Sequence, residues 1–301
     1  MTLFIIVGAT ATGKSELALE IAERIDGEII NADSMQLYRG MDIGTAKLSP
    51  GERRGITHHL IDTLNVNEES SVAAYQESAR SIIDRLISEG KSVVVVGGTG
   101  LYIKAILDDL NFPETNPEVR KRISDEAERL GAEIMHQRLS KLDPAAAVAI
   151  PKENVRRVVR ALEVIEITGR PFTAHLPRAS ESRYPSARQI GLVMNRENLR
   201  ERIDRRVDHM WERGLVDEVK ALIPQGIREG KTAQAALGYS QILTFLDGEI
   251  AEGEAKEETK RATRQYARRQ ETWFSRDERI QWVKPEKNLA STILSTTMGS
   301  S

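Results

Sequence analysis

The chain has 301 residues, of which 40% are hydrophobic and 29% are charged, and its net charge at pH 7 is −2. This ordinary composition allows one large domain or two smaller ones, and the near-neutral charge gives no global sign of nucleic-acid binding. The absence of cysteine excludes disulfides and cysteine-ligated zinc. No apolar run approaches the roughly 18 residues of a membrane span, so we expect a cytoplasmic protein without a membrane partner.

The first motif in the chain is a P-loop. The segment Gly8–Ser15 reads G-x-x-x-x-G-K-S, follows the apolar run 3–7 and leads into a helical pattern. In this strand-loop-helix context, backbone amides and a helix N-terminus converge on phosphate oxygens. Lys14 is expected to neutralise phosphate charge, and Ser15 to ligate a Mg²⁺ held by the phosphates. The predicted phosphate-binding residues are Gly8, Ala9, Thr10, Ala11, Thr12, Gly13, Lys14 and Ser15.

A carboxylate follows the second predicted strand. That strand covers residues 28–32, and Asp33-Ser34-Met35-Gln36 comes directly after it. This order places Asp33 at the carboxyl end of a strand beside the P-loop, where open α/β sheets bind their ligands. From the local sequence alone, a turn or a helix cap explains Asp33 equally well.

A short strand is predicted over residues 58–62. A fourth strand is predicted over residues 92–96, after an amphipathic helix over residues 70–89. It ends in Gly97-Gly98-Thr99-Gly100, where Thr99 offers a hydroxyl to a ligand. No Asp or Glu ends this strand, so the Walker-B carboxylate of nucleotide hydrolases is missing. This argues against an ordinary ATPase.

The organisation changes near Pro113. Helices are predicted to begin at Asn116, Asp143 and Asn154, which are residue types that cap helix N-termini. We interpret residues 113–187 as an all-helical insertion into an α/β core formed by residues 1–112 and 188–294. The last of its helices carries three arginines, for which a solvated face is the simpler interpretation: Arg156, Arg157 and Arg160.

The C-terminal part returns to a strand at residues 189–194 and continues with helices. A long helix capped by Asn195 or Asn198 buries one face, and Arg206 lies at the edge of that face. Arg206 either extends along the apolar surface to solvent or reaches into a site. Residues 295–301 are rich in Ser, Thr and Gly and are expected to be disordered.

The last long helix, over residues 255–274, is predicted to place Ala262, Tyr266 and Trp273 inward. A basic stripe lies on its opposite side, at helical spacing. The stripe suits a nucleic-acid backbone, or is simply a solvated helix face. Its members are Arg261, Arg264 and Arg268.

Taken together, these motifs resemble the tRNA dimethylallyltransferases, specifically the bacterial enzymes that prenylate the adenosine 3′ of the anticodon. The resemblance covers most of the chain. It rests on Gly8–Ser15, Asp33–Tyr38, Met41–Lys47, His58–Asp62, Val96–Tyr102, Arg160–Val164, Gly238–Tyr239 and Thr263–Gln270.

The resemblance implies a P-loop NTPase-like parallel sheet flanked by helices, with the insertion serving as a tRNA-binding domain. The P-loop would hold dimethylallyl diphosphate with Mg²⁺, and Asp33 would be the general base on adenine N6. Lys14, Thr99 and Arg206 would act on the departing diphosphate. The implied tRNA-binding residues are Asp33, Ser34, Met35, Gln36, Thr99, Arg156, Arg157, Arg160, Gly238, Tyr239, Arg261, Arg264 and Arg268.

The expected partners are therefore the anticodon stem-loop of tRNA and dimethylallyl diphosphate, bound by a monomer. A P-loop small-molecule kinase is the main alternative, because it uses the same first motif and a mobile helical lid. A non-enzymatic RNA-binding NTPase switch is a third possibility. Whether ATP also binds the P-loop stays open at this point.

Overall fold

The computed structural model describes residues 2–110, 112–175 and 182–298. It divides into two compact units. The core unit comprises Met1–Ile106 and Tyr184–Ser301, and the helical unit comprises Leu107–Arg183. In the part of the chain described, no helix is both long and apolar enough to cross a membrane.

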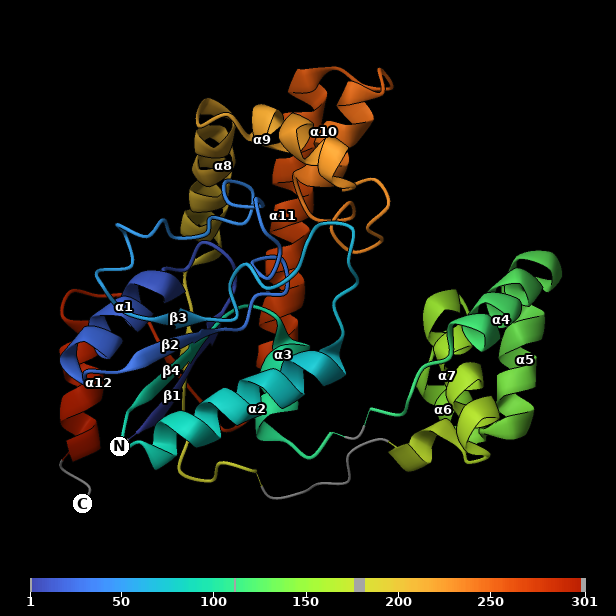
Figure 1. Cartoon of the computed structure of the whole chain (residues 1–301), viewed down its shortest axis with the longest axis horizontal. Coiled ribbons are helices and arrows are strands. Elements are labelled where there is room, and N and C mark those ends of the chain that lie inside the picture. Colours follow the sequence, from blue (N-terminus) through green and yellow to red (C-terminus); the bar gives the residue numbers. More distant parts are fainter. Residues whose placement is uncertain (1, 111, 176–181, 299–301) are drawn as a thin grey trace. The chain divides into compact units, whose positions relative to one another are not determined.

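The core unit is built on a six-stranded parallel sheet with the order β3-β2-β4-β1-β5-β6 (Figure 1). Because every neighbouring pair is parallel, all carboxyl ends meet at one edge. The predicted α/β fold class is confirmed. Of the predicted strands, the one at residues 58–62 shrinks to two residues, and the last strand was not predicted. The strands are β1 Leu3–Gly8, β2 Glu28–Asn31, β3 His58–His59, β4 Val93–Val96, β5 Arg188–Leu192 and β6 Ile280–Val283.

Helices cover both faces of this sheet. Alternate residues of β1 point to opposite faces, so Phe4 and Ile6 pack against α1 (Lys14–Arg24) and α12 (Leu289–Met298). On the other face lie α2 (Val72–Ser88) and α3 (Gly100–Leu107), as Figure 1 shows. All six residues of β1 are buried, as expected for a central parallel strand.

The predicted disorder of residues 295–301 is wrong for residues 295–298, which form the end of α12. Leu289, Ala290 and Ile293 of this helix are buried in the core cluster beside α1. Their spacing gives the helix an apolar face that the Ser- and Thr-rich composition conceals. Residues 299–301 lie outside the described residues.

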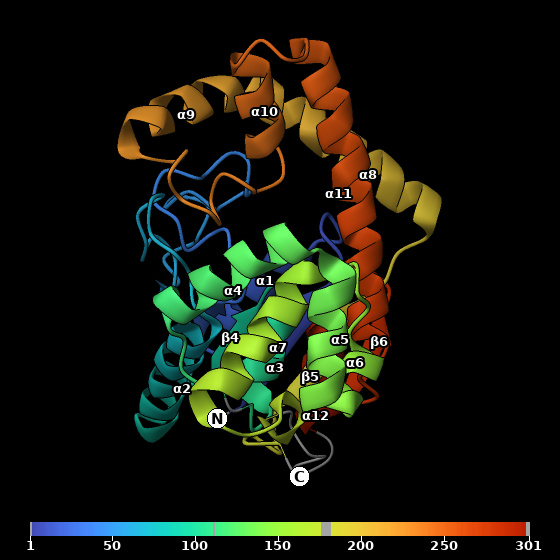
Figure 2. The same cartoon turned by 90° about the vertical axis from the view of Figure 1, so that its right-hand side faces the viewer.

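Four helices lie beyond the carboxyl ends of the strands (Figures 1 and 2). Three of them, α8, α9 and α10, share a core cluster that also holds Tyr38 and Met41 from the loop after β2. The first of these helices is capped by Asn195, whose side chain accepts from the Glu197 amide at 2.8 Å, so Asn195 and not Asn198 is the cap. The helices are α8 Arg196–Glu212, α9 Leu215–Leu222, α10 Tyr239–Leu246 and α11 Glu252–Phe274, with a short 3₁₀ turn, Ile223–Gln225, after α9.

The inward face of α11 differs from the prediction. Its buried residues include Thr259, Ala267 and Gln270, whereas Trp273 is 44% exposed. Hydrophobicity alone set the predicted register, and it missed a face that buries small and polar side chains against the sheet edge. The predicted inward position of Trp273 is therefore wrong.

The helical unit is a small bundle with its own core, centred on Ile123, Leu139 and Leu162. Asn116, Asp143 and Asn154 cap helices as predicted. The helix after Gly131 was not predicted, and residues 176–181 of the predicted insertion lie outside the described residues. The elements are α4 Pro117–Leu130, α5 Ala132–Leu142, α6 Pro144–Ala149, α7 Val155–Thr168 and a 3₁₀ turn, Phe172–His175.

A buried carboxylate holds the beginning of this unit. The Glu163 side chain is 0% exposed and accepts from the Asn116 amide at 3.0 Å, Arg120 Nε at 2.9 Å and Arg160 Nη1 at 2.9 Å. Arg160 also donates to the Pro113 carbonyl at 2.7 Å. Arg160 is therefore a structural residue in this unit, which leaves less of its guanidinium for the predicted tRNA contact.

We expect Glu163→Ala to destabilise the helical unit by about 3 kcal/mol, because it removes the buried acceptor of three hydrogen bonds, two of them from arginines. Glu166→Ala is the matched control: Glu166 pairs with Arg122 at the surface of the same helix, so its loss should cost less than about 1 kcal/mol. Hydrogen exchange of α4 and α7 peptides in the full chain measures both. Equal protection in the two variants would contradict this role of Glu163.

Candidate active site

The P-loop is shaped by glycines and by its own side chains. Gly8 has φ +140°, and a Cβ there would lie 2.6 Å from the Leu192 carbonyl oxygen, so only glycine fits. The Ala9 carbonyl accepts from Lys14 Nζ at 2.6 Å and from the buried Thr12 hydroxyl at 2.8 Å. Gly8, Ala9 and Thr12 thus form the loop rather than offering side chains to a ligand.

Backbone amides of this loop form an anion site. The amides of residues 11–16 donate to no acceptor within the described parts of the chain. They precede or open α1, whose N-terminus carries positive partial charge. Unpaired amides at a helix N-terminus are a phosphate site by their chemistry alone. The predicted phosphate-binding segment therefore has the required geometry.

One side chain of α11 fixes the loop to the sheet. The Thr10 amide donates to Gln270 Oε1 at 2.8 Å, and Gln270 Nε2 donates to the Gly98 carbonyl at 2.9 Å. A side chain at Gly98 would collide with Gln270. Gln270 was part of a recognised motif, but no single-residue role was predicted for it. The feature that could have identified Gln270 as a site residue is its polar side chain on the buried face of α11.

Asp33 is held at the same edge by Asn31. The Asn31 side chain accepts from the Asp33 amide and donates to its carbonyl, both at 2.9 Å, and also donates to the Leu60 carbonyl at 2.8 Å. Asp33 Oδ1 accepts from the Met35 amide at 2.9 Å. Strand β2, which precedes Asp33, is separated from the P-loop strand β1 by β4. The shared carboxyl edge still brings Asp33 over the loop.

Thr99 supports the Asp33 segment from the end of β4. Its amide donates to the Ala32 carbonyl at 3.1 Å, and its hydroxyl accepts from the Ser34 amide at 3.1 Å. Thr99 lines neither of the two cavities described below. In this structure it positions the loop, and direct contact with a ligand stays a prediction.

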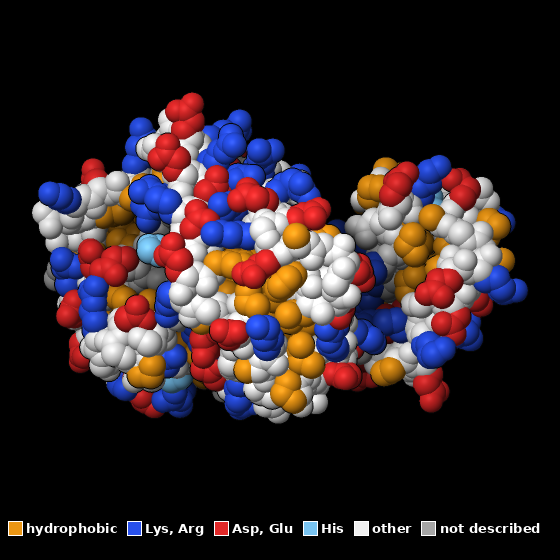
Figure 3. All heavy atoms as spheres, turned by 90° about the horizontal axis from the view of Figure 1, so that it is seen from above, with side chains coloured by type: hydrophobic (Ala, Val, Ile, Leu, Met, Phe, Trp, Pro, Cys, Tyr) orange, Lys and Arg blue, Asp and Glu red, His pale blue; other side chains and the backbone are white. Residues whose placement is uncertain are grey.

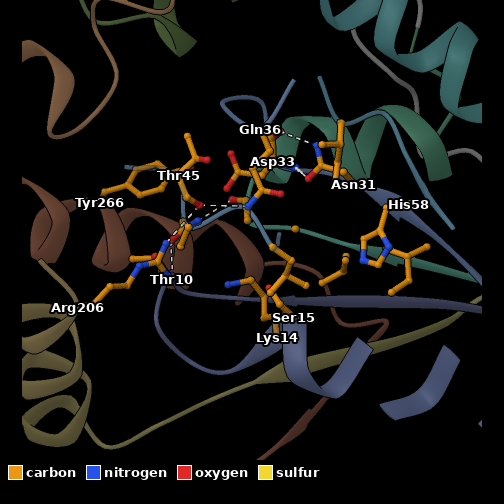
Figure 4. A pocket seen from close by; sticks show the side chains of 18 residues that line it. Thr10, Lys14, Ser15, Asn31, Asp33, Gln36, Thr45, His58, Arg206 and Tyr266 are labelled. Carbon is orange, nitrogen blue, oxygen red and sulfur yellow. Dashed lines mark hydrogen bonds between the residues drawn. The ribbon is translucent and has the colours of Figure 1, made fainter. Parts of the chain in front are cut away.

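The first cavity joins the P-loop to Asp33 (Figure 4). Lys14 and Ser15 lie on one side of it and Asp33 on the facing side. Arg206 and Tyr266 lie toward one end. Arg206 donates to the Thr45 carbonyl at 3.5 Å and lines the cavity. The structure therefore favours the interpretation that Arg206 reaches into a site over the one in which it extends to solvent.

The charges in this cavity are coupled. Burial, and then the positive charge of Arg206, lower the pKa of Lys14 to about 7, while Asp33 opposes the shift. Burial also lowers the pKa of Arg206, again opposed by Asp33. Two cations crowd one carboxylate here, which is an arrangement that a bound anion would relieve.

A divalent cation has few protein ligands in this cavity. In the described residues, no three His, Asp or Glu side chains converge to hold a metal ion. The Ser15 hydroxyl, which has no hydrogen bond to any described residue, lies beside the unpaired amides. Mg²⁺ prefers phosphate oxygens and water with one or two protein oxygens, so Ser15 and a bound diphosphate fit this ion.

A second cavity of about 300 Å³ meets the first at Asp33. Ser34, Met35 and Tyr239 line only the second cavity, whereas Gln36 lines the first and donates to the Thr45 carbonyl at 3.1 Å. The residues common to both cavities are Thr10, Asp33, Thr45, Arg206 and Tyr266.

Tyr266 and Arg269 were not predicted as site residues. Burial raises the pKa of Tyr266 to about 12, the negative charge of Asp33 acts in the same direction, and hydrogen bonding to Thr99 and Gln270 opposes it. The Arg269 guanidinium lies 5.7 Å from the Tyr266 ring centroid and also lines the second cavity. An aromatic ring with a stacked cation suits a flat heterocycle.

Glu218 organises the loop that closes both cavities. Its carboxylate accepts from the amides of Asp42, Ile43 and Gly44 and, at 2.5 Å, from the Tyr239 hydroxyl. Tyr239 and Gly238 are buried, and a side chain at Gly44 would overlap the Tyr239 ring. The predicted tRNA contact of Gly238–Tyr239 is thereby limited to the part of Tyr239 that lines the second cavity.

The predicted basic residues differ in how free they are. Figure 3 shows acidic and basic side chains interspersed over the visible face of the core unit. Arg261 pairs with Glu258, and Arg264 pairs with Asp204 of α8. The prediction that Arg264 faces away from the protein is therefore wrong. Three other arginines are exposed and have no ion pair to a described residue: Arg156, Arg157 and Arg268.

Known proteins show extensive similarity to this chain. A model of the IPP transferase family matches residues 36–277. The tRNA dimethylallyltransferase of Streptomyces avermitilis is 57% identical over 278 residues, which cover 92% of this chain and 88% of the relative. That of Thermobifida fusca is 58% identical over 287 residues, covering 94% and 89%.

Solved structures lead to the same group. The tRNA isopentenylpyrophosphate transferase of Bacillus halodurans has a TM-score of 0.72 and 39% identity, covering 99% of this chain and 96% of that one. A eukaryotic dimethylallyltransferase acting on tRNA has a TM-score of 0.84 and 26% identity, covering 99% and 79%.

The lowered pKa of Lys14 predicts proton uptake on anion binding. At pH 8 free Lys14 is mostly neutral, and a bound polyanion favours its charged form, so inorganic pyrophosphate should bind with uptake of about one proton and more weakly as pH rises through about 7. Calorimetry in two buffers of different ionisation enthalpy measures the uptake. Lys14→Arg, which stays charged, is the control. Equal uptake in both proteins would contradict the prediction.

Proposed function

The chain belongs to the IPP transferase family, and we propose that it transfers a dimethylallyl group from dimethylallyl diphosphate to N6 of the adenosine 3′ of the anticodon in tRNA. Its relatives are named tRNA dimethylallyltransferases at more than half identity, so it is a prenyl-transferring enzyme that acts on tRNA. The kinase and the NTPase switch are set aside on this ground. The observation that carries the finer proposal is the meeting of an anion cavity and a second cavity at one carboxylate, Asp33.

The diphosphate is assigned to the P-loop. The unpaired amides of residues 11–16 would bind its oxygens, and Lys14 and Arg206 supply positive charge. As the bond from the allylic carbon to the diphosphate oxygen breaks, the leaving group gains the electron pair. Donors already aimed at it stabilise that state without reorganising. Arg206 thereby acts on the leaving group.

Mg²⁺ would be held by Ser15 together with the diphosphate oxygens. The ion would neutralise part of the charge of the leaving group. The free Ser15 hydroxyl beside the unpaired amides supports this assignment. ATP shares the same phosphate chemistry, so binding of ATP at the loop is compatible with this site.

Asp33 is assigned as the general base. The amine N6 is a weak nucleophile because its lone pair is delocalised into the ring, so removal of its proton must accompany formation of the carbon–nitrogen bond. Among the described residues, only Oδ1 of Asp33 accepts a backbone hydrogen bond, which leaves Oδ2 for this proton. The Asn31 side chain holds the backbone amide and carbonyl of Asp33 and so fixes the position of this residue at the sheet edge.

The adenine is assigned to the second cavity. A base stacked in an anticodon loop cannot reach Asp33, so it must be flipped out of the stack. Ser34, Met35 and Tyr266 line the cavity that would receive it. Beyond the base, exposed arginines without ion pairs, such as Arg156, Arg157 and Arg268, would contact backbone phosphates.

Transfer of labelled dimethylallyl from its diphosphate to unmodified tRNA, with Mg²⁺ present and an ATP-only control, tests the reaction. We expect label in tRNA from the wild type, and a loss of roughly 10²- to 10⁴-fold in Asp33→Asn with tRNA binding kept. Asp33→Asn preserves the shape and the Met35 contact, so it separates chemistry from folding. Near-normal rates would remove Asp33 from the mechanism.

Arg206→Ala should lower the single-turnover rate roughly 10²- to 10³-fold, because a donor to the leaving group is lost. Its affinity for tRNA should change little, since Arg206 is half-buried within the core unit. Rapid-quench measurement at saturating substrates reports the rate, and thermal unfolding controls for stability. An effect on stability alone would return Arg206 to a packing role.

A further inference from the structure

A third cavity lies beside the P-loop, and Asp33 is not among the residues that line it. It is lined by Gly13, Lys14 and Ser15 together with Arg202 and Arg206 of α8. A Cβ built on Gly13 would lie 3.9 Å from Arg202 Nη2, so the guanidinium of Arg202 stands next to the loop. Arg202 was not a predicted site residue.

The two arginines are one helical turn apart and present their charges at different depths. Arg206 is half-buried and Arg202 is exposed. Arg202 has no hydrogen bond or ion pair to any residue that the structure describes. The one carboxylate that lines this cavity, Glu16, is already paired with Arg54. Arg202 is therefore a free cation beside unpaired amides.

The position of the reacting carbon sets the direction of the diphosphate. That carbon must face Asp33, which lines the first and second cavities but not the third. The phosphate that carries the carbon therefore lies toward the first cavity. The terminal phosphate extends away from Asp33 toward the third cavity, while Arg206 borders both.

We propose that Arg202 binds the terminal phosphate of the diphosphate, and that it sets the affinity for the diphosphate group and for the pyrophosphate product. This inference rests on the proposed function, because it uses the orientation that prenyl transfer requires. Arg206 acts on the breaking bond, and Arg202 holds the far end. A substrate with one phosphate would not reach Arg202.

The test compares Arg202→Ala with Arg205→Ala. Arg205 is an exposed arginine on the same turn of α8 that lines none of the three cavities, so its removal takes away equal charge. We expect Arg202→Ala to raise KM for dimethylallyl diphosphate and the inhibition constant of inorganic pyrophosphate roughly 10-fold or more. Inhibition by inorganic orthophosphate should change less than about 2-fold, and Arg202→Lys should restore part of the affinity.

Two results would overturn the proposal. One is an equal effect of Arg202→Ala and Arg205→Ala, which would mean general electrostatic attraction. The other is equal weakening of pyrophosphate and orthophosphate inhibition, which would place Arg202 at the inner phosphate. Absence of prenyl transfer in the wild type would refute the proposed function instead. Calorimetric titration of pyrophosphate into the wild type and both variants then still decides the role of Arg202.

Discussion

The structure depends on a pair of hydrogen bonds made by Gln270. This α11 side chain accepts from the Thr10 amide of the P-loop and donates to the Gly98 carbonyl at the end of β4. It lies 260 residues from Thr10 in the sequence, so the last long helix must dock before the loop is fixed. Because Gln270 is 5% exposed, losing either bond would leave a buried polar group unpaired. The anion site therefore exists only in the completed core unit.

The residue after Gly98 extends this network of hydrogen bonds to the Asp33 segment. This residue, Thr99, binds the Ala32 carbonyl and the Ser34 amide, and thereby fixes both sides of Asp33. On the opposite wall, Glu218 gathers three loop amides and the Tyr239 hydroxyl, which places the Thr45 carbonyl against Arg206. Each functional group is thus held by a polar residue from a different part of the chain. Such networks rigidify a site when every member is satisfied.

The sequence was sufficient where local chemistry decides. The P-loop, the caps at Asn116 and Asn154, and the buried run of β4 follow from short-range rules. It was insufficient where tertiary packing decides. The register of α11 depends on polar Gln270 being buried, and the free or paired state of Arg264 depends on Asp204 of another helix. No sequence pattern marks Arg202 as a site residue, because only the folded structure places it next to the P-loop.

The carboxyl end of β4 differs from that of nucleotide hydrolases in a way that fits the proposed role of this P-loop in alkyl transfer. In nucleotide hydrolases the strand beside the P-loop strand ends in a metal-binding acid. Here β4 ends at Val96 and is followed by Gly97, where any side chain would collide with the backbone of Ala32. The close approach that glycine allows brings the segment after β2 over the loop and puts Asp33 above Lys14. One backbone contact therefore leaves no room for the acid of the hydrolases and allows the carboxylate of Asp33, the proposed base, to face the anion site. An acidic side chain at position 97 would therefore displace the segment that carries Asp33.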